Sequence, residues 1–317
     1  MKKIAVIGEC MIELNGTPFG TMEQTFGGDT LNTAIYLKRT AKLNTATDKL
    51  DVLYITAMGC DPLSKAMIER WQKEGIDTRH VLVDDMRTAG LYMIQVDENG
   101  ERTFLYWRNQ SAARYLLSHP KFTQVKHCLE HVDAIFVSGI SLAILSSRDR
   151  SRLLTLLEQF RSQGIEVIFD SNYRPALWPH DELASVRACY LTMYQTTNLA
   201  LVTFEDEQRI WGDQSAQQTL TRLHSLGVKT VIVKQGDKGC LLSTSESTSP
   251  FYVPASAVSN VVDTTSAGDS FNGGFLAHYL AGSSLITACE YGNHLAGIVI
   301  QHKGAIIPAH ITHPTYS

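Results

Sequence analysis

The 317-residue sequence has little of what marks several large classes of protein. Its six cysteines lie far apart without a Cys-x-x-Cys pair, which argues against a disulfide framework or a zinc knuckle and fits a reducing cytoplasm. The eleven histidines show no metal-ligand spacing, and the closest ones, His119, His127 and His131, are expected on the surface of a helical segment. No apolar run approaches the roughly 18 residues of a membrane span, so no membrane partner is expected.

Neither sign of charge dominates, because 28 Lys and Arg stand against 32 Asp and Glu. A nucleic-acid partner held by bulk charge is therefore not expected. The apolar run at residues 4–7 is only strand-length and is followed by Gly8 and Glu9, which argues against a signal peptide. With 44% hydrophobic and 19% charged residues, the chain reads as a soluble globular protein of one large or two smaller domains.

The first predicted strand also lacks the Gly-x-Gly-x-x-Gly fingerprint of a dinucleotide fold, since the chain continues Gly8-Glu9-Cys10-Met11-Ile12-Glu13. Short apolar runs nevertheless alternate with helical patterns, most regularly from residue 130 onward. This alternation predicts an α/β fold whose parallel sheet is covered by helices on both faces.

Residues 262–271 are typical of a loop that turns directly into a helix. Thr265 and Ser266 are suitable N-caps, and an apolar-rich run follows from Phe271. The first N–H groups of such a helix have no intrahelical partner and lie at the positive end of its dipole, so they predict an anion site. Asp269 repels an anion and is explained as a base for a hydroxyl that attacks a phosphate. An equal alternative is that Asp269 is simply an acidic first-turn residue that the helix dipole favours.

A glycine pair precedes another predicted helix near the N-terminus. Gly27 and Gly28 come before a helix that should begin near Asp29 or Thr30, and such pairs suggest backbone close to a ligand. Asn32 in the first turn is a candidate to hydrogen-bond a polyol. A plain glycine turn with an N-cap explains the same residues, and the local sequence favours it.

Alternating runs at residues 89–96 and 102–107 flank an Asn-Gly pair, which predicts a β-hairpin. The hairpin interrupts the β-then-α order, so it is expected to leave the main sheet. With residues 12–26 it is expected to form a small lid.

Three side chains of this hairpin are candidate ligands. Tyr106 and Arg108 share one face of a strand, and Tyr92 is expected to join them from the partner strand. Arg108 is a candidate to clamp a carboxylate with a bidentate contact. The alternative is an exposed edge-strand arginine that stacks on aromatic rings.

Polar residues also gather where the later strands end. The exits of neighbouring parallel strands line the ligand crevice of an α/β sheet. In this chain these exits hold Asn172, Arg174, Asp206, Lys234 and Gly236.

The segment Asp263-Thr-Thr-Ser-Ala-Gly-Asp269 resembles the C-terminal signature D-T-x-G-A-G-D of the ribokinase-like (PfkB) sugar kinases. The Gly27-Gly28 turn with Asn32 resembles the N-terminal motif of that family, and the order of elements matches along nearly the whole chain. The resemblance implies a ribokinase-like three-layer α/β/α sandwich with a mainly parallel sheet and a small β-strand lid. The expected body comprises residues 1–11, 27–87 and 110–317, and the expected lid comprises residues 12–26 and 88–109.

Within the family, residues 8–14, 106–109 and 170–178 resemble the 2-keto-3-deoxygluconate kinases. A substrate with a carboxylate needs cationic partners that a neutral sugar does not, and Arg108 and Arg174 supply two. The resemblance implies that the sugar acid contacts Gly28, Asn32, Tyr92, Tyr106, Arg108, Arg174 and Asp269.

The family pattern also implies an ATP site and a catalytic loop. Ser266 stands where the family usually has glycine, which is tolerable only if the backbone there keeps a negative φ. The implied catalytic residues are the base Asp269 and the anion-hole residues Ser266, Ala267 and Gly268. The implied ATP-binding residues are Asn172, Lys234, Gly236, Gly239, Ser266, Ala267, Gly268 and Asn293.

Mg²⁺ is expected to bridge ATP oxygens, and its protein partners are less well defined. The family's Asn-x-x-Glu magnesium motif appears here as Thr203-x-x-Asp206, which puts the metal role of Asp206 in doubt. Many family members bind a monovalent cation near the signature loop, and Asp263 and Thr265 are the candidates for K⁺ here.

The prediction is an ATP-dependent kinase that phosphorylates 2-keto-3-deoxy-D-gluconate on its 6-hydroxyl, and the galactonate epimer remains open. The first alternative is a kinase of a neutral sugar such as fructose or ribose. The second is a non-catalytic sugar- or nucleotide-binding protein, whose expected mark is a damaged signature loop, whereas Gly268 and Asp269 are intact. A lid with one apolar face also makes a homodimer through the lid an expectation.

Overall fold

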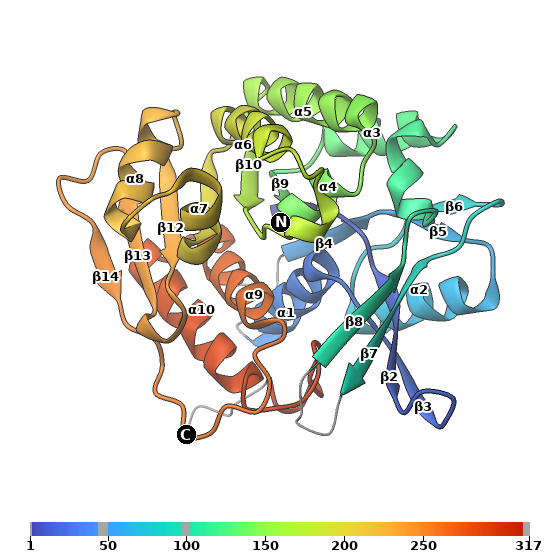
Figure 1. The fold of residues 1–317 in the computed structure, drawn as a ribbon. Helices are drawn as coiled ribbons and strands as arrows, with labels where there is room; N and C mark the ends of the chain where they lie inside the picture. Colours follow the sequence, from blue (N-terminus) through green and yellow to red (C-terminus); the bar gives the residue numbers. More distant parts are fainter. Residues whose placement is uncertain (1, 44–49, 97–101, 313–317) are drawn as a thin grey trace.

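The computed structural model describes residues 2–43, 50–96 and 102–312, and its centre is an eight-stranded sheet (Figure 1). From β4 through β1, β9, β10 and β11 to β12 the neighbours are parallel, whereas β13 and β14 add an antiparallel edge. The predicted α/β class is confirmed. The strands are β1 (Lys2–Ile7), β4 (Leu50–Ile55), β9 (Ala134–Ser138), β10 (Glu166–Asp170), β11 (Leu199–Thr203), β12 (Thr230–Lys234), β13 (Cys240–Thr244) and β14 (Phe251–Val253).

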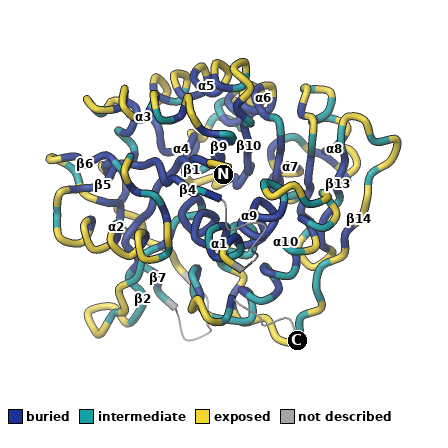
Figure 2. Tube along the Cα trace, turned by 180° about the vertical axis from the view of Figure 1, so that it is seen from behind, coloured by how far each residue is buried: buried dark blue, intermediate teal, exposed yellow. Residues whose placement is uncertain are grey.

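Helices cover both faces of this sheet, and two hydrophobic cores result. In β1, Ala5 and Ile7 face one core while Ile4 and Val6 face the other, which is why the strand is apolar without alternation. Figure 2 shows the buried sheet between exposed outer helix surfaces. One layer holds α1 (Asp29–Leu43), α2 (Pro62–Glu74), α9 (Ala267–Leu280) and α10 (Leu285–Val299). The other holds α3 (Phe122–Leu129), α4 (Gly139–Ala143), α5 (Ser147–Ser162), α6 (Ala184–Thr196), α7 (Phe204–Trp211) and α8 (Ala216–Ser225).

The helix ends follow local chemistry. Helix α2 begins after Asp61, whose side chain accepts the Ser64 N–H, and it ends at Gly75 in the left-handed conformation. Helix α7 begins immediately after β11, so the polar exit at Asp206 lies in the first turn of a helix. Short 3₁₀ turns are η1 (Ala112–Ser118), η2 (Pro175–Leu177) and η3 (Gly236–Lys238).

A separate four-stranded sheet joins the two segments that were expected to leave the main sheet. Its order is β3-β2-β7-β8, and Tyr92 pairs directly with Tyr106 across the β7–β8 ladder. The predicted hairpin turn at residues 97–101 lies outside the described residues. The strands are β2 (Met11–Gly16), β3 (Met22–Gly27), β7 (Gly90–Val96) and β8 (Arg102–Trp107), and β5 (Ala57–Gly59) pairs with β6 (Leu82–Asp84) in a third, two-stranded sheet.

The six cysteines are free thiols, as their spacing predicted, and Cys60 is exposed. Among the helices of the described ranges, none combines the length and apolar character that crossing a bilayer requires.

Candidate active site

The Gly27-Gly28 turn and the signature loop at residues 263–269 meet at the carboxyl ends of the parallel strands, beside the N-termini of α1 and α9 (Figure 1). The Asn32 side-chain amide on α1 donates to Oδ2 of Asp269 on α9 at 2.9 Å, across 237 positions of sequence. The Thr33 hydroxyl donates to the Asp269 carbonyl at 3.3 Å. Helices α1 and α9 are therefore packed so that one presents an amide to the carboxylate of the other.

Burial and neighbouring negative charge act on Asp269. Desolvation, followed by repulsion from Asp29, raises the pKa of Asp269 to about 7. Hydrogen bonds from Asn32 and from the Ser266 hydroxyl, the latter at 3.0 Å, oppose this rise in pKa. A carboxylate whose pKa lies near neutrality is suited to accept a proton from an alcohol.

The signature loop has a conformation that the sequence did not predict. Ser266 has φ 65° and ψ 13°, so the expectation of a negative φ was wrong. Its side chain caps no N–H group, which also corrects its predicted N-cap role. The Ala267 N–H donates to the Thr264 carbonyl at 3.2 Å.

Free donors remain at the start of α9. Within the described chain, the N–H groups of Gly268 and Asp269 have no acceptor, as expected for a first helical turn. A Cβ placed on Gly268 would lie 3.6 Å from the Lys234 ammonium nitrogen. This corner therefore offers two backbone donors beside a lysine, which is the chemistry of an anion site.

Lys234 belongs to a buried polar cluster at the end of β12. Its ammonium contacts Oδ2 of Asp170 at 3.3 Å and the Asn272 side-chain oxygen at 3.1 Å. The Asn272 amide donates to the same Asp170 oxygen at 2.6 Å. The sequence analysis missed Asp170 and Asn272 as site residues, although Asp170 directly ends a predicted strand.

Asp29 is a second acid that the sequence analysis treated only as a helix start. It accepts hydrogen bonds from the Ser138 hydroxyl and, at 2.8 Å, from the Asn172 amide. Burial raises the pKa of Asp29, and Asp170 adds to the rise while Arg174 opposes it. Asn172 itself has φ 29°, so this strand exit is held in an uncommon backbone conformation.

Arg174 lies close enough to Asp206 and Asp29 for its charge to act on both carboxyl groups. Oδ2 of Asp206 accepts the Tyr173 N–H at 3.0 Å. Burial raises the pKa of Asp206 to about 6, and Arg174 lowers it through its positive charge. Arg174 is exposed and forms no ion pair with another described residue, which leaves its guanidinium available to a ligand.

Other residues of the protein pack closely against the Gly27-Gly28 pair. A Cβ on Gly28 would lie 2.2 Å from the Glu9 carbonyl oxygen, and one on Gly27 would lie 2.7 Å from the Tyr92 hydroxyl. Backbone crowding therefore explains Gly28, whereas the atom closest to Gly27 belongs to the Tyr92 side chain. The Gly28 N–H points at the Asn32 side-chain oxygen, at 3.4 Å, so the turn and Asn32 act as one unit.

Arg108 is buried at 6% exposure, which contradicts the alternative of an exposed edge-strand arginine. Its guanidinium forms an ion pair with Glu9, and Glu9 also accepts the Ser111 hydroxyl. The Arg108 Nε is buried and has no partner among the described atoms. Glu9, which the sequence analysis did not select, therefore ties the small sheet to the body and neutralises much of the Arg108 charge.

Two tyrosines of the small sheet stand next to Arg108. The Arg108 guanidinium lies 6.0 Å from the ring centre of Tyr106, and the rings of Tyr106 and Tyr92 are 6.0 Å apart. Tyr92 is buried and donates its hydroxyl to Glu13, whereas Tyr106 is 53% exposed. Tyr106 thus presents an aromatic face to whatever enters beside it.

The residues expected around ATP fall into two groups. Lys234 and Asn172 lie in the polar clusters described above. Gly236 and Gly239 have positive φ, and a Cβ on Gly239 would lie 2.2 Å from the Val253 carbonyl oxygen. Asn293 donates to the carbonyls of Val253 and Pro254, at 3.3 and 2.9 Å, so its amide holds the end of β14.

The residues expected to hold a monovalent cation stabilise the loop. Oδ1 of Asp263 accepts the Thr265 N–H and Oδ2 accepts the Gly304 N–H, both at 3.0 Å. These bonds join the signature loop to the segment after α10. The K⁺ site stays a prediction.

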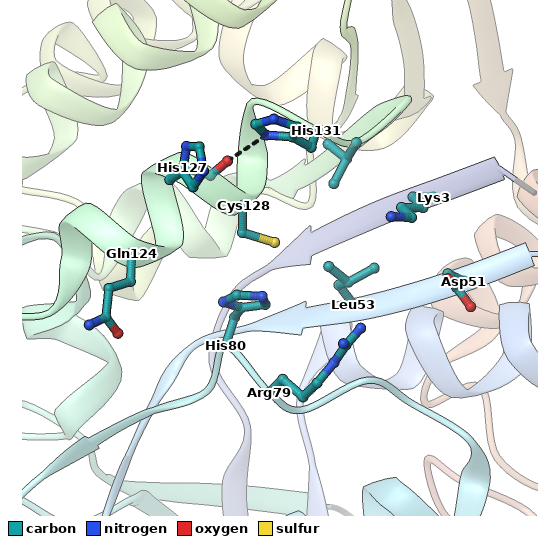
Figure 3. A pocket seen from close by; sticks show the side chains of 10 residues that line it. Lys3, Asp51, Leu53, Arg79, His80, Gln124, His127, Cys128 and His131 are labelled. Carbon is teal, nitrogen blue, oxygen red and sulfur yellow. Dashed lines mark hydrogen bonds between the residues drawn. The ribbon is translucent and has the colours of Figure 1, made fainter.

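A cavity of about 310 Å³ lies at the opposite end of the sheet, where β1 and β4 begin (Figure 3). His127 and His131 border it, and both are exposed as predicted. The expectation of no metal-ligand spacing needs correction, because ligand atoms of His127, Glu130 and His131 all lie within 4.8 Å of one another. This cluster is remote from the Asp269 edge and has no part in the site.

Comparison with known proteins supplies an independent view. Residues 1–312 match the family described as pfkB family carbohydrate kinase. A 2-dehydro-3-deoxygluconokinase of Haemophilus influenzae is 53% identical over 97% of this chain and 96% of its own length. One of Dickeya dadantii is 46% identical over 97% of each chain. The crystal structure of a 2-dehydro-3-deoxygluconokinase from Thermotoga maritima superposes with a TM-score of 0.80 at 19% identity, covering 97% of this chain and 96% of that chain.

Proposed function

The chain belongs to the pfkB family of carbohydrate kinases, and within this family we propose that it transfers the γ-phosphoryl group of ATP to the 6-hydroxyl of 2-keto-3-deoxy-D-gluconate. This compound is the 2-dehydro-3-deoxygluconate in the names of the relatives. Two relatives of that name, at 53% and 46% identity, support the proposal.

The observation that carries the proposed chemistry is the Asp269 carboxylate at the N-terminus of α9, held by Asn32 from α1. Asp269 accepts the proton of the attacking hydroxyl. The free N–H groups of Gly268 and Asp269, with the Lys234 ammonium, stabilise charge on the transferring phosphoryl group. Phosphoryl transfer mainly needs such positioning and charge stabilisation.

Arg108 and Arg174 are proposed to recognise the carboxylate of the sugar acid. Arg174 is exposed and without an ion pair in the described chain, and the Arg108 Nε is a buried donor that lacks an acceptor. Both observations favour an anionic ligand. Gly28, Asn32, Tyr92 and Tyr106 would line the rest of the sugar site.

One observation favours a neutral sugar as the second candidate. Glu9 already pairs with Arg108, so the charge of this arginine is partly compensated without a ligand. A fructose or ribose kinase needs no further cation at that position.

Magnesium chemistry fits the acids of this edge. Asp206 is buried, and repulsion from Asp170 helps to raise its pKa, so a cation beside them relieves unfavourable charge. Asp206 and Asp170 are the residues that would hold Mg²⁺, directly or through water. When bound, the ion would neutralise charge on the ATP phosphate.

The small sheet is proposed to act as a lid and as a dimer contact. Its edge strand β8 exposes Phe104, Leu105, Tyr106 and Trp107 by 38–56%. An apolar edge strand of this kind pairs readily with a second strand, so two copies of the chain are expected to join there.

The testing experiment measures ADP release with ATP and Mg²⁺ on four substrates: 2-keto-3-deoxygluconate, its galactonate epimer, fructose and ribose. Turnover confined to the keto-deoxy acids is the expected result. Turnover on fructose or ribose instead establishes the second candidate and removes the arginines from carboxylate recognition.

A further inference from the structure

The Ser266 side chain makes a contact that a backbone role in the anion hole does not require. Its hydroxyl donates to Oδ2 of Asp269 at 3.0 Å, the same oxygen that accepts the Asn32 amide at 2.9 Å. Oδ1 of Asp269 accepts no hydrogen bond from the described residues. Two donors therefore fix one oxygen of the carboxylate and leave the other open.

This contact depends on an unfavourable backbone conformation. Ser266 has φ 65°, in the left-handed region that glycine adopts freely and a serine adopts rarely. Its carbonyl accepts both the N–H and the hydroxyl of Ser270, at 2.9 and 2.8 Å, which holds the residue in place. A strained residue that its surroundings hold in place is a mark of functional sites.

We propose that Ser266 is a positioning residue for phosphoryl transfer. Its hydroxyl and the Asn32 amide together hold Oδ2 of Asp269, so that Oδ1 faces the proton of the substrate hydroxyl. The proposal rests on the proposed function for its kinetic part, whereas the contact itself can be tested without substrate.

The charges around Asp269 oppose its ionisation, so the hydrogen bond from the Ser266 hydroxyl matters for the charged form. Asp29 from α1 and Asp170 from β10 oppose ionisation of Asp269, and Lys234 from β12 lies near the adjoining Gly268. Tyr36 from α1 is a further titratable group that interacts with Asp269. Hydrogen bonds to the charged form are thus what favours an ionised Asp269 against burial and two acids.

Two variants separate the hydroxyl from the backbone strain. Ser266→Gly removes both the hydroxyl and the strain, so Tm rises by about 2 °C. Ser266→Ala removes the hydroxyl and keeps the strain, so Tm does not rise. In both variants kcat falls by about 3–10-fold at pH 7, and the loss shrinks toward pH 9, because the acid limb of the pH profile moves to higher pH. KM for ATP stays within about twofold.

A Ser266→Gly enzyme with wild-type kcat and pH profile would overturn the proposal. A raised KM for ATP with an unchanged pH profile would also overturn it, because that result assigns Ser266 to phosphate binding alone.

A second measurement needs no turnover. The difference in Tm between each protein and its Asp269→Asn counterpart is followed from pH 4 to pH 9, and its midpoint reports ionisation of Asp269. The midpoint lies at higher pH in the Ser266→Gly background than in the Ser266 background. Equal midpoints contradict the proposal, even if the wild-type protein phosphorylates no sugar acid and the proposed function itself fails.

Discussion

At the residue scale, the ionisation of a single carboxylate, that of Asp269, is subject to opposing effects. Burial and Asp29 resist ionisation of Asp269, while Asn32 and Ser266 support it. The sequence predicted Asp269 and Asn32 as separate candidates. The structure joins them through one hydrogen bond, which favours a site over two unrelated helix starts.

Asp269→Asn is expected to lower kcat by about 10²–10⁴-fold, because the amide cannot accept the proton of the attacking hydroxyl. Binding of the sugar should change little, since the amide keeps the size of the carboxyl group. Steady-state kinetics with the sugar acid measures the effect, and Asp85→Asn, at an exposed position outside the site, is the control. Near-normal turnover of Asp269→Asn removes this residue from the role of base.

The raised pKa of Asp269 also predicts a pH dependence of stability. The pKa of an unfolded aspartate is about 3.9. The stability that the partly buried neutral form of Asp269 contributes is therefore lost as pH rises from there through the folded pKa of about 7. Asp269→Asn should therefore be more stable than the wild type at pH 8, by about 4 kcal/mol, and nearly equally stable at pH 4. Urea unfolding at the two pH values measures this, and a constant difference between them contradicts it.

Arg108 is best tested together with its buried partner. Removal of the guanidinium alone leaves Glu9 buried without a counter-ion, which destabilises the fold for reasons unrelated to substrate. Arg108→Met is therefore made in a Glu9→Gln background, with Glu9→Gln as control. KM for the sugar acid should rise by about 10–100-fold relative to that control, as for a lost charged hydrogen bond. An unchanged KM refutes the clamp.

At the scale of elements, the sequence predicted those helices and strands that local residue patterns determine. The apolar strands and the antiparallel pairing of β7 with β8 follow from periodicity and turn chemistry. The buried pair of Glu9 and Arg108 did not follow, because the two residues are 99 positions apart and no local pattern links them. The left-handed conformation of Ser266 was missed, although the glycine that the family usually has at this position is the residue that adopts a positive φ freely.

Helices α1 and α9 must touch closely for Asn32 to reach Asp269. A Cβ on Gly273 would lie 2.6 Å from the Tyr36 Cβ and 2.8 Å from the Leu37 nitrogen, so Gly273 sets their separation. Gly273→Ala should destabilise the protein by about 2–4 kcal/mol. It should also lower kcat, because it displaces Asn32 from Asp269. Gly297→Ala on α10, whose Cβ meets its nearest side-chain atom at 3.3 Å, is the matched control. Equal stability of the two variants contradicts this role.

At the scale of the whole molecule, family membership and fold agree with the sequence prediction, since the pfkB match spans residues 1–312.

The proposed homodimer rests on the exposed apolar side chains of strand β8. Trp107, 56% exposed on that strand, should be buried in a dimer. Trp107→Glu is expected to shift the protein from dimer to monomer in light scattering. Phe251→Glu on β14, an edge strand of the eight-stranded sheet, is the control and is expected to leave the dimer intact. A wild-type monomer at tens of micromolar contradicts the dimer.

The most direct measurement is the position of the phosphate in the product formed from ATP and 2-keto-3-deoxygluconate, read by ³¹P and ¹³C NMR. The account predicts one product whose phosphorus couples to carbon 6. A phosphate on another oxygen, or ADP release without a phosphorylated sugar acid, contradicts the claim that this chain is a 6-kinase of the keto-deoxy acid.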